Sequence, residues 1–127
     1  HPYFHNHRNM EIETALKRLS ALAQQGRLEV FRLLVQAGRD GMAAGDLARS
    51  VGVAPNTLSA QLTILTNAGL ARSRRDGRSI IYAADYEGRG DLLRFLMQDC
   101  CQGRPEICAP VTAAAQACCA QTQGTVQ

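Results

Sequence analysis

The chain has 127 residues, a length that suits one domain better than two. Hydrophobic residues make up 46% and charged residues 20%, and no apolar run reaches the ~18–20 residues of a membrane span. We therefore expect a cytoplasmic protein that does not contact the membrane. The net charge of +3 is modest, but arginines cluster in residues 72–78. Such a local patch is typical either of a nucleic-acid contact or of a solvated charge run.

The N-terminal part predicts a leader followed by two helices. All 3 histidines lie in residues 1–9, ahead of Met10, so we interpret 1–9 as a tag-like or disordered leader. A first helix is predicted from Glu11, and a second from about residue 27 to 37, because apolar residues recur at helical spacing. Core packing is a sufficient explanation for both apolar stripes, although an N-terminal helix like the first often contributes to a dimer. The first stripe comprises Ile12, Leu16, Leu19 and Leu22 or Ala23.

A short helix over residues 43–50 and a longer one over 55–68 follow. Pro55 favours a helix start, since proline suits the first helical position. Leucines at 58, 62 and 65 give this helix one apolar face, and the opposite face is small, uncharged and polar. A solubilising surface would carry Lys and Glu instead, so we expect this helix to enter a DNA major groove, with a plain structural helix as the alternative. The residues predicted to contact DNA from this helix are Asn56, Thr57, Ser59, Ala60, Gln61 and Thr63.

A basic hairpin and a last helix complete the predicted fold. Asp76-Gly77 separates two strand-like segments, residues 70–75 and 78–83, which is a strong hairpin signal. Its arginines are expected to contact DNA phosphates, through Arg74, Arg75 and Arg78. A helix over residues 90–101 has a broad apolar face that suits a partner helix, whereas the tail beyond it, rich in Ala, Gln and Thr, is predicted to be partly disordered.

Residues 53–70, followed by Arg74-Arg75-Asp76-Gly77-Arg78 and Tyr82, resemble the winged helix-turn-helix of the ArsR/SmtB family of metalloregulatory repressors. The similarity covers about residues 10–97. It implies a mostly α fold with a small β-hairpin, and a homodimer through the first and last helices that represses transcription at an imperfect palindrome in double-stranded operator DNA. Residues 10–101 would form the DNA-binding and dimerisation domain and 102–127 a cysteine-containing tail. The implied dimer interface includes Leu16, Leu19, Leu92, Phe95 and Leu96.

The usual metal sites of this family are not matched. Residues 42–46 contain no cysteine, and no histidine follows His7. The family often has histidines at positions 60 and 61, where this chain has Ala and Gln, so the operator sequence is not carried over.

The 5 cysteines all lie near the C-terminus and are expected to be thiols in a reducing compartment. Cys100, Cys101 and Cys108 offer a site of sulfur donors alone, which suits As(III) or Sb(III) as the inducer, and some arsenic sensors of the family carry a similar arrangement. Zinc, cadmium or lead, with Cys118 or Cys119 as an accessory ligand, and a thiol redox sensor remain alternatives.

No cofactor is expected for DNA binding, and no small organic substrate. An enzyme is not expected, because the histidines lie in the predicted leader and the sequence shows neither a base beside a cysteine nor a phosphate-binding loop.

Overall fold

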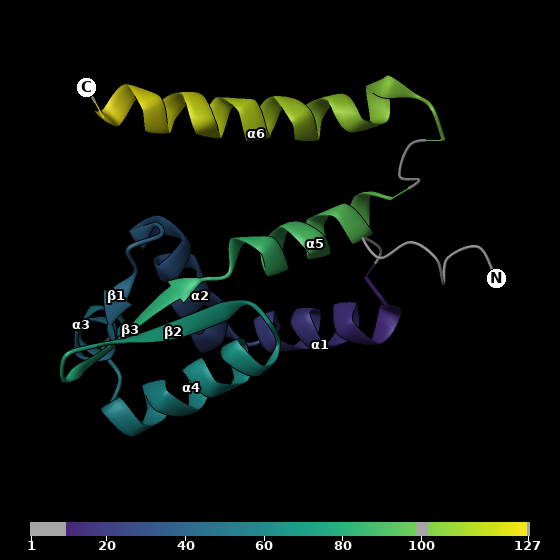
Figure 1. The fold of residues 1–127 in the computed structure, drawn as a ribbon. Helices are drawn as coiled ribbons and strands as arrows, with labels where there is room; N and C mark the ends of the chain where they lie inside the picture. Colours follow the sequence, from purple (N-terminus) through teal and green to yellow (C-terminus); the bar gives the residue numbers. More distant parts are fainter. Residues whose placement is uncertain (1–9, 99–101, 127) are drawn as a thin grey trace. The chain divides into compact units, whose positions relative to one another are not determined.

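A computed structural model describes residues 10–98 and 102–126 of the chain. The chain divides into two compact units, one ending at Phe95 and the other beginning at Leu96, and each is described by itself. The described residues form six helices and three strands (Figure 1). In chain order they are α1 (Ile12–Leu22), α2 (Gln25–Ala37), β1 (Met42–Ala43), α3 (Ala44–Val51), α4 (Pro55–Asn67), β2 (Ala71–Asp76), β3 (Ser79–Ala84), α5 (Tyr86–Met97) and α6 (Pro105–Val126).

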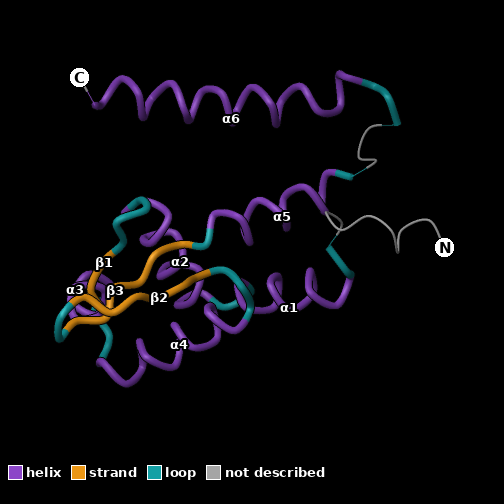
Figure 2. The backbone as a smooth tube through the Cα atoms, in the orientation of Figure 1, coloured by secondary structure: helices purple, strands orange, loops and turns teal. Residues whose placement is uncertain are grey.

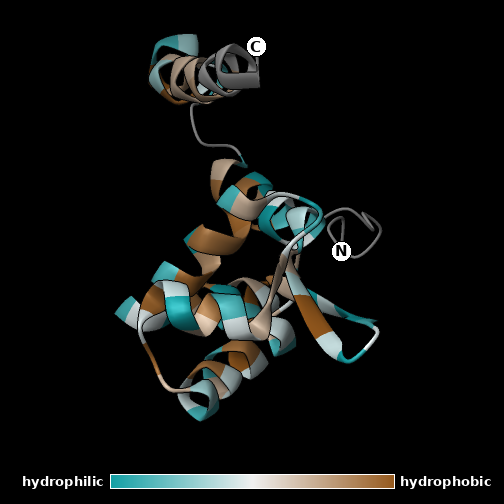
Figure 3. Ribbon diagram, turned by 90° about the vertical axis from the view of Figure 1, so that its left-hand side faces the viewer, coloured by the Kyte–Doolittle hydropathy of each residue, from teal (hydrophilic) through white to brown (hydrophobic). Residues whose placement is uncertain are grey.

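The core of the first unit joins α2, α3 and α4. Figure 2 shows the three strands at one end of this unit, next to these helices. Along the helices hydrophobic and hydrophilic residues alternate, as expected when one face of each helix is buried (Figure 3). The largest side chains that are completely buried are all aliphatic: Leu34, Leu47, Leu58, Leu62, Leu65, Leu70 and Val30. Burial of each leucine contributes about 1.5–3 kcal/mol, so this cluster fixes the inward face of α4.

The connection between α3 and α4 is a tight turn that the sequence dictates. Gly52 ends α3 in the left-handed conformation with φ 74°, and its N–H donates to the carbonyl of Ala48 at 2.9 Å. Ala54 is extended, and Pro55 begins α4. The helix starts and ends predicted for this segment are confirmed to within a residue.

The sheet has the strand order β1-β3-β2, and all pairs are antiparallel. The predicted hairpin is present, with Arg75 opposite Ile80 and Asp76 opposite Ser79. The loop is therefore Gly77-Arg78 rather than Asp76-Gly77, and Gly77, with φ 62°, takes the first loop position as a type II′ turn requires. The two-residue strand β1 was not predicted, because it is extended only through pairing with β3.

Core packing explains the apolar stripe of α1 only in part, because Leu22 packs against the core whereas Leu16 and Leu19, which the resemblance assigns to a dimer interface, are exposed. Ile12 is 61% exposed and Leu16 is 58% exposed, whereas Ala15 and Ala21 are the buried residues of α1. The helical spacing was correct, but spacing alone does not distinguish a core face from a face left open.

Both C-terminal helices differ from their predictions. Helix α5 begins at Tyr86 rather than near residue 90, because the carboxylate of Asp85 accepts a hydrogen bond from the N–H of Gly88 at 3.0 Å and caps the helix start. The tail predicted to be partly disordered is instead a helix, α6. Alanine, the strongest helix former, dominates its middle, and Pro110 lies within it. No helix among the described residues is long and apolar enough to span a bilayer.

Candidate nucleic-acid interface

The outward face of α4 is exposed, polar and without charge. Its buried residues Leu58, Leu62 and Leu65 repeat at helical spacing and turn the opposite face outward. On that face the predicted DNA-contacting residues are all exposed except for one: Asn56, Thr57, Ser59, Ala60 and Thr63 are exposed, and Gln61 is half-buried. We call α4 the reading helix from here on.

Two polar side chains of the reading helix take part in hydrogen bonds within the helix. The side-chain oxygen of Asn56 accepts a hydrogen bond from the N–H of Thr57 at 3.0 Å. The hydroxyl of Thr63 donates to the carbonyl of Ser59 at 2.9 Å. Asn56 therefore retains its amide donors, and Thr63 retains its oxygen lone pairs, for contacts with base edges or phosphates.

Gln61 lies elsewhere than the sequence predicts. A Cβ atom added at Gly26 of α2 would overlap its Nε2 atom, so its side chain lies against the start of α2. Its Oε1 atom is buried and has no hydrogen-bond partner among the described residues. The predicted contact of Gln61 with DNA does not match this position, because the glycine opposite lets the side chain pack inward.

The β2–β3 hairpin, called the wing below, presents its arginines on both faces. Arg72, Arg74, Arg75 and Arg78 are all exposed. Because alternate strand residues point to opposite faces, Arg72 and Arg74 share one face and Arg75 lies on the other. Arg74 Nη2 donates to the carbonyl of Asp40 at 3.1 Å and ties the wing to the loop before β1. The wing thus offers a concentration of positive charge beside the reading helix.

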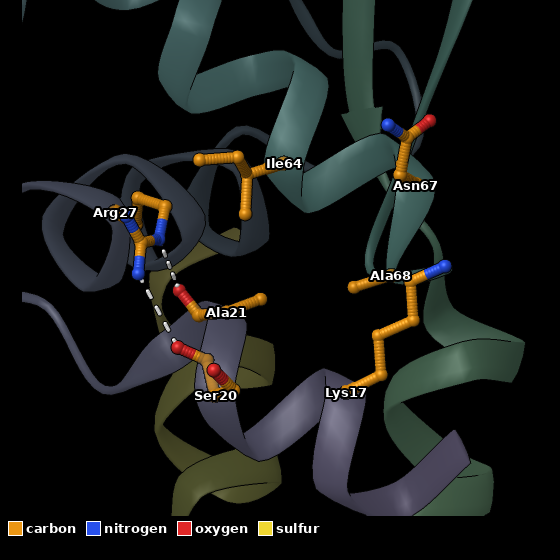
Figure 4. A pocket seen from close by; sticks show the side chains of 7 residues that line it. All are labelled: Lys17, Ser20, Ala21, Arg27, Ile64, Asn67 and Ala68. Atoms are coloured by element: carbon orange, nitrogen blue, oxygen red, sulfur yellow. Dashed lines mark hydrogen bonds between the residues drawn. The ribbon is translucent and has the colours of Figure 1, made fainter. Parts of the chain in front are cut away.

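A cavity of about 280 Å³ separates part of α1 from the reading helix. Arg27 of α2 closes one side, since its Nε donates to the carbonyl of Ala21 at 2.7 Å and its Nη2 to that of Ser20 at 3.3 Å (Figure 4). The lining residues are Lys17, Ser20, Ala21, Arg27, Ile64, Asn67 and Ala68. The pocket is open to solvent and lies between the end of α1 and the end of the reading helix.

Arg18, the half-buried arginine of α1 that lies next to this region, was not predicted from the sequence. It donates to backbone carbonyls at the end of α4 and in α5. Lys17 precedes Arg18 directly, and the sequence gives no signal that distinguishes the half-buried arginine from its exposed neighbour.

The residues predicted for a dimer interface fall into two groups. Leu16 and Leu19 are exposed on α1, and Leu96 is 51% exposed near the end of α5. Leu92 is only 4% exposed and Phe95 is half-buried, so Leu92 packs within its own chain. The inward orientation of Leu92 corrects the prediction that it faces a partner.

The described cysteines lie on α6, and two of the predicted metal ligands, Cys100 and Cys101, lie outside the described residues. Cys108 is half-buried, and Cys118 and Cys119 are exposed. Ten residues of α-helix span about 15 Å, so α6 holds Cys108 too far from Cys118 to share one ion. Within residues 10–98 and 102–126 no three His, Cys, Asp or Glu side chains are grouped as a metal site.

Comparison with known proteins identifies the class of this fold. A helix-turn-helix domain family matches residues 22–74. The HTH-type transcriptional regulator Rv0081 of Mycobacterium tuberculosis is 39% identical over 62 residues, which is 49% of this chain and 53% of that protein. The chain thus spans about half the length of the curated relatives that it matches first.

Solved structures extend the likeness over more of the chain. NolR from Sinorhizobium fredii is 34% identical with a TM-score of 0.55, covering 68% of this chain and 83% of that one. The winged helix-turn-helix DNA-binding domain of Mb0332 from Mycobacterium bovis, described as homodimeric and as a possible ArsR-family regulator, is 28% identical with a TM-score of 0.56, covering 69% and 81%. The fold is that of a winged helix-turn-helix protein, and its relatives are regulators rather than enzymes. The chain therefore has a helix-turn-helix domain and is similar to ArsR-like transcriptional regulators.

Proposed function

We propose that the chain is a repressor that binds operator DNA as a homodimer and dissociates when As(III) or Sb(III) binds its cysteine thiolates. The observation that carries the DNA-binding part is the exposed, uncharged polar face of the reading helix beside the cationic wing. An α-helix with its side chains is about 10–12 Å wide and enters a major groove about 12 Å wide. Small residues such as Ser59 and Ala60 let the helix backbone approach the base edges.

The wing supplies affinity that does not depend on sequence. Arginines contact phosphates without reading bases, and each phosphate neutralised adds about 0.9 to the slope of log affinity against log salt. Asp76 is the one acidic residue in β2 and β3, so little within the wing opposes this attraction. The reading helix would select the sequence, and the wing would hold the protein on the duplex.

A second copy of the chain is the partner proposed for the open face of α1. Ile12, Leu16 and Leu19 are large apolar residues that the chain does not cover, and Leu93 of α5 is 50% exposed. The homodimeric state given for Mb0332 supports this assignment. Two reading helices related by a twofold axis would occupy major grooves about 34 Å apart on an imperfect palindrome.

The inducer part of the proposal is based on donor chemistry. Cys100, Cys101 and Cys108 contribute sulfur alone, and soft thiolate ligands prefer thiophilic ions. Three sulfurs complete the pyramidal coordination of As(III) or Sb(III), whereas structural zinc requires a fourth ligand. The distance along α6 argues against Cys118 as that ligand while the helix is intact.

The DNA-binding proposal is tested by selecting duplexes from a random pool and measuring their affinity by fluorescence anisotropy. We expect a palindromic consensus, a stoichiometry of two chains per site, and an affinity that falls steeply with salt. A protein that binds selected and scrambled duplexes equally at every salt concentration would contradict the assignment of the reading helix.

The inducer is tested on the selected duplex with arsenite, antimonite, zinc, cadmium, lead and peroxide. We expect arsenite and antimonite to release the DNA from the wild-type protein, and Cys100→Ser, Cys101→Ser and Cys108→Ser each to require much more arsenite. Cys119→Ser is the matched control on α6 and should respond like the wild type. Release by zinc or by peroxide in place of arsenite would assign the alternative effector.

A further inference from the structure

Arg18 connects three helices through one guanidinium group. It lies in α1 and is half-buried. Its Nε donates to the carbonyl of Ala68 at 2.8 Å, and its Nη1 donates to the carbonyl of Gly88 at 2.8 Å. Ala68 is the C-terminal cap of the reading helix, and Gly88 lies in the first turn of α5. The open face of α1, the end of the reading helix and the start of α5 thus meet at this side chain.

Two glycines make this junction possible. Gly69 has φ 79°, and a Cβ atom there would lie 2.8 Å from Arg18 Nη2. A Cβ atom at Gly88 would overlap the carbonyl oxygen of Gly69. Next to them the N–H of Asp85 donates to the carbonyl of Leu70 at 2.9 Å. The end of the reading helix and the start of α5 are therefore in direct backbone contact, with no side chain between them.

The chemistry of the junction requires arginine. The carbonyl of Ala68 lies at the negative end of the α4 dipole, so its hydrogen bond to a guanidinium is charge-assisted. Arginine holds two donors in a rigid planar fork, whereas lysine has one mobile ammonium group and does not reproduce both bonds in the same geometry. The cavity lined by Lys17 and Ile64 also reaches Ala68, so it lies beside this bond.

We propose that Arg18 is a positioning residue that couples α5 to the reading helix. A displacement of α5 moves the Gly88 carbonyl and so shifts the Arg18 guanidinium that is bonded to it. Because the same guanidinium is bonded to Ala68, the end of the reading helix tilts, and the neighbouring cavity leaves room for this movement. The inference rests on the proposed function, because it requires the reading helix to bind DNA. It adds the route by which an effector near the end of α5 changes operator affinity.

The first test compares Gly88→Ala with Gly90→Ala. In Gly88→Ala the new methyl group overlaps the carbonyl of Gly69 and separates α5 from the reading helix, and we expect the operator affinity of the intact dimer to fall about tenfold without any effector. Gly90→Ala is the matched control in the same helix, because its methyl group meets only Arg94 Nη1, at an ordinary 3.5 Å. Equal operator affinity of the two variants would overturn the proposal.

The second test removes the guanidinium group of Arg18 and uses a charge-matched control. Arg18→Met and the exposed Lys17→Met each remove one positive charge from α1. Arsenite lowers the operator affinity of the wild type by some factor. We expect that factor to be at least about fivefold smaller in Arg18→Met and unchanged in Lys17→Met. A merely structural role would lower the unfolding midpoint and leave that ratio as it is, and this result would overturn the proposal.

A third measurement separates failure of this inference from failure of the proposed function. Amide hydrogen exchange on the DNA-free protein requires neither operator nor inducer. We expect faster exchange in residues 64–70 of Arg18→Met, with no change in Lys17→Met. If the wild type binds no duplex or ignores arsenite, the proposed function fails, and this measurement still shows whether Arg18 positions the end of the reading helix. Unchanged exchange in Arg18→Met would refute it directly.

Discussion

Leu16→Ala should weaken the dimer strongly while leaving the fold of each chain intact. Full burial of a leucine side chain contributes about 1.5–3 kcal/mol, so burial of the 58% of Leu16 that is exposed contributes about 0.9–1.7 kcal/mol. In a twofold interface each substitution occurs twice, so the dimer loses about 1.7–3.5 kcal/mol. We therefore expect the dimer dissociation constant to rise about 15- to 300-fold.

Sedimentation velocity over a dilution series measures this constant directly. Leu28→Ala is the matched control, because Leu28 is 41% exposed but lies on α2 and is not among the residues proposed for the interface. Its dissociation constant should stay within about twofold of the wild type, as for ordinary surface substitutions. If Leu16→Ala dimerises like Leu28→Ala, α1 does not form the dimer interface and the reasoning from its exposed leucines is wrong.

Three further predictions concern other parts of the molecule. Arg75→Ala should weaken binding to all duplexes alike and reduce the salt slope by about 0.9, measured by anisotropy at several salt concentrations; a change in sequence preference would contradict a phosphate contact. Leu62→Ala should lower the free energy of unfolding by about 2–5 kcal/mol in a denaturant titration at fixed protein concentration, because Leu62 is completely buried. Gly41→Ala should also lower the stability, since a methyl group there would overlap the carbonyl of Tyr82 and φ is 75°; an unchanged midpoint would count against the β1–β3 pairing.

The sequence predicts the helix-turn-helix and the wing well because their signals are local. Gly52, Pro55 and Gly77 each have a conformational requirement that fixes a boundary. β1 has no such signal, because its two residues are extended only through contact with a strand about 40 positions later. The tail lacks the large apolar residues that mark a packed helix, and its helix depends instead on the high helix propensity of alanine.

The site was predicted less completely than the fold, for a physical reason. Helical spacing places Gln61 at the edge of the outward face, but the direction of its side chain depends on the space left by Gly26, which is distant in sequence. Periodicity likewise identifies α1 as amphipathic without saying whether its apolar face meets its own chain or another. The interface with a second copy and the core of the same chain both remove a leucine side chain from water, so the sequence pattern is the same in the two cases.

The distribution of side-chain sizes on α1 would link the proposed dimerisation with DNA binding. Ala15 and Ala21 face inward and permit a close approach to the rest of the unit, while Leu16 and Leu19 face outward. Arg18 lies between these two faces and reaches the end of the reading helix. A partner that packs on the leucines therefore also restricts the helix from which Arg18 extends. We expect Leu16→Ala to lower operator affinity even at protein concentrations where the dimer is fully formed, measured by anisotropy against Leu28→Ala. Equal affinities under those conditions would show that the dimer contributes only the second reading helix and does not orient the first.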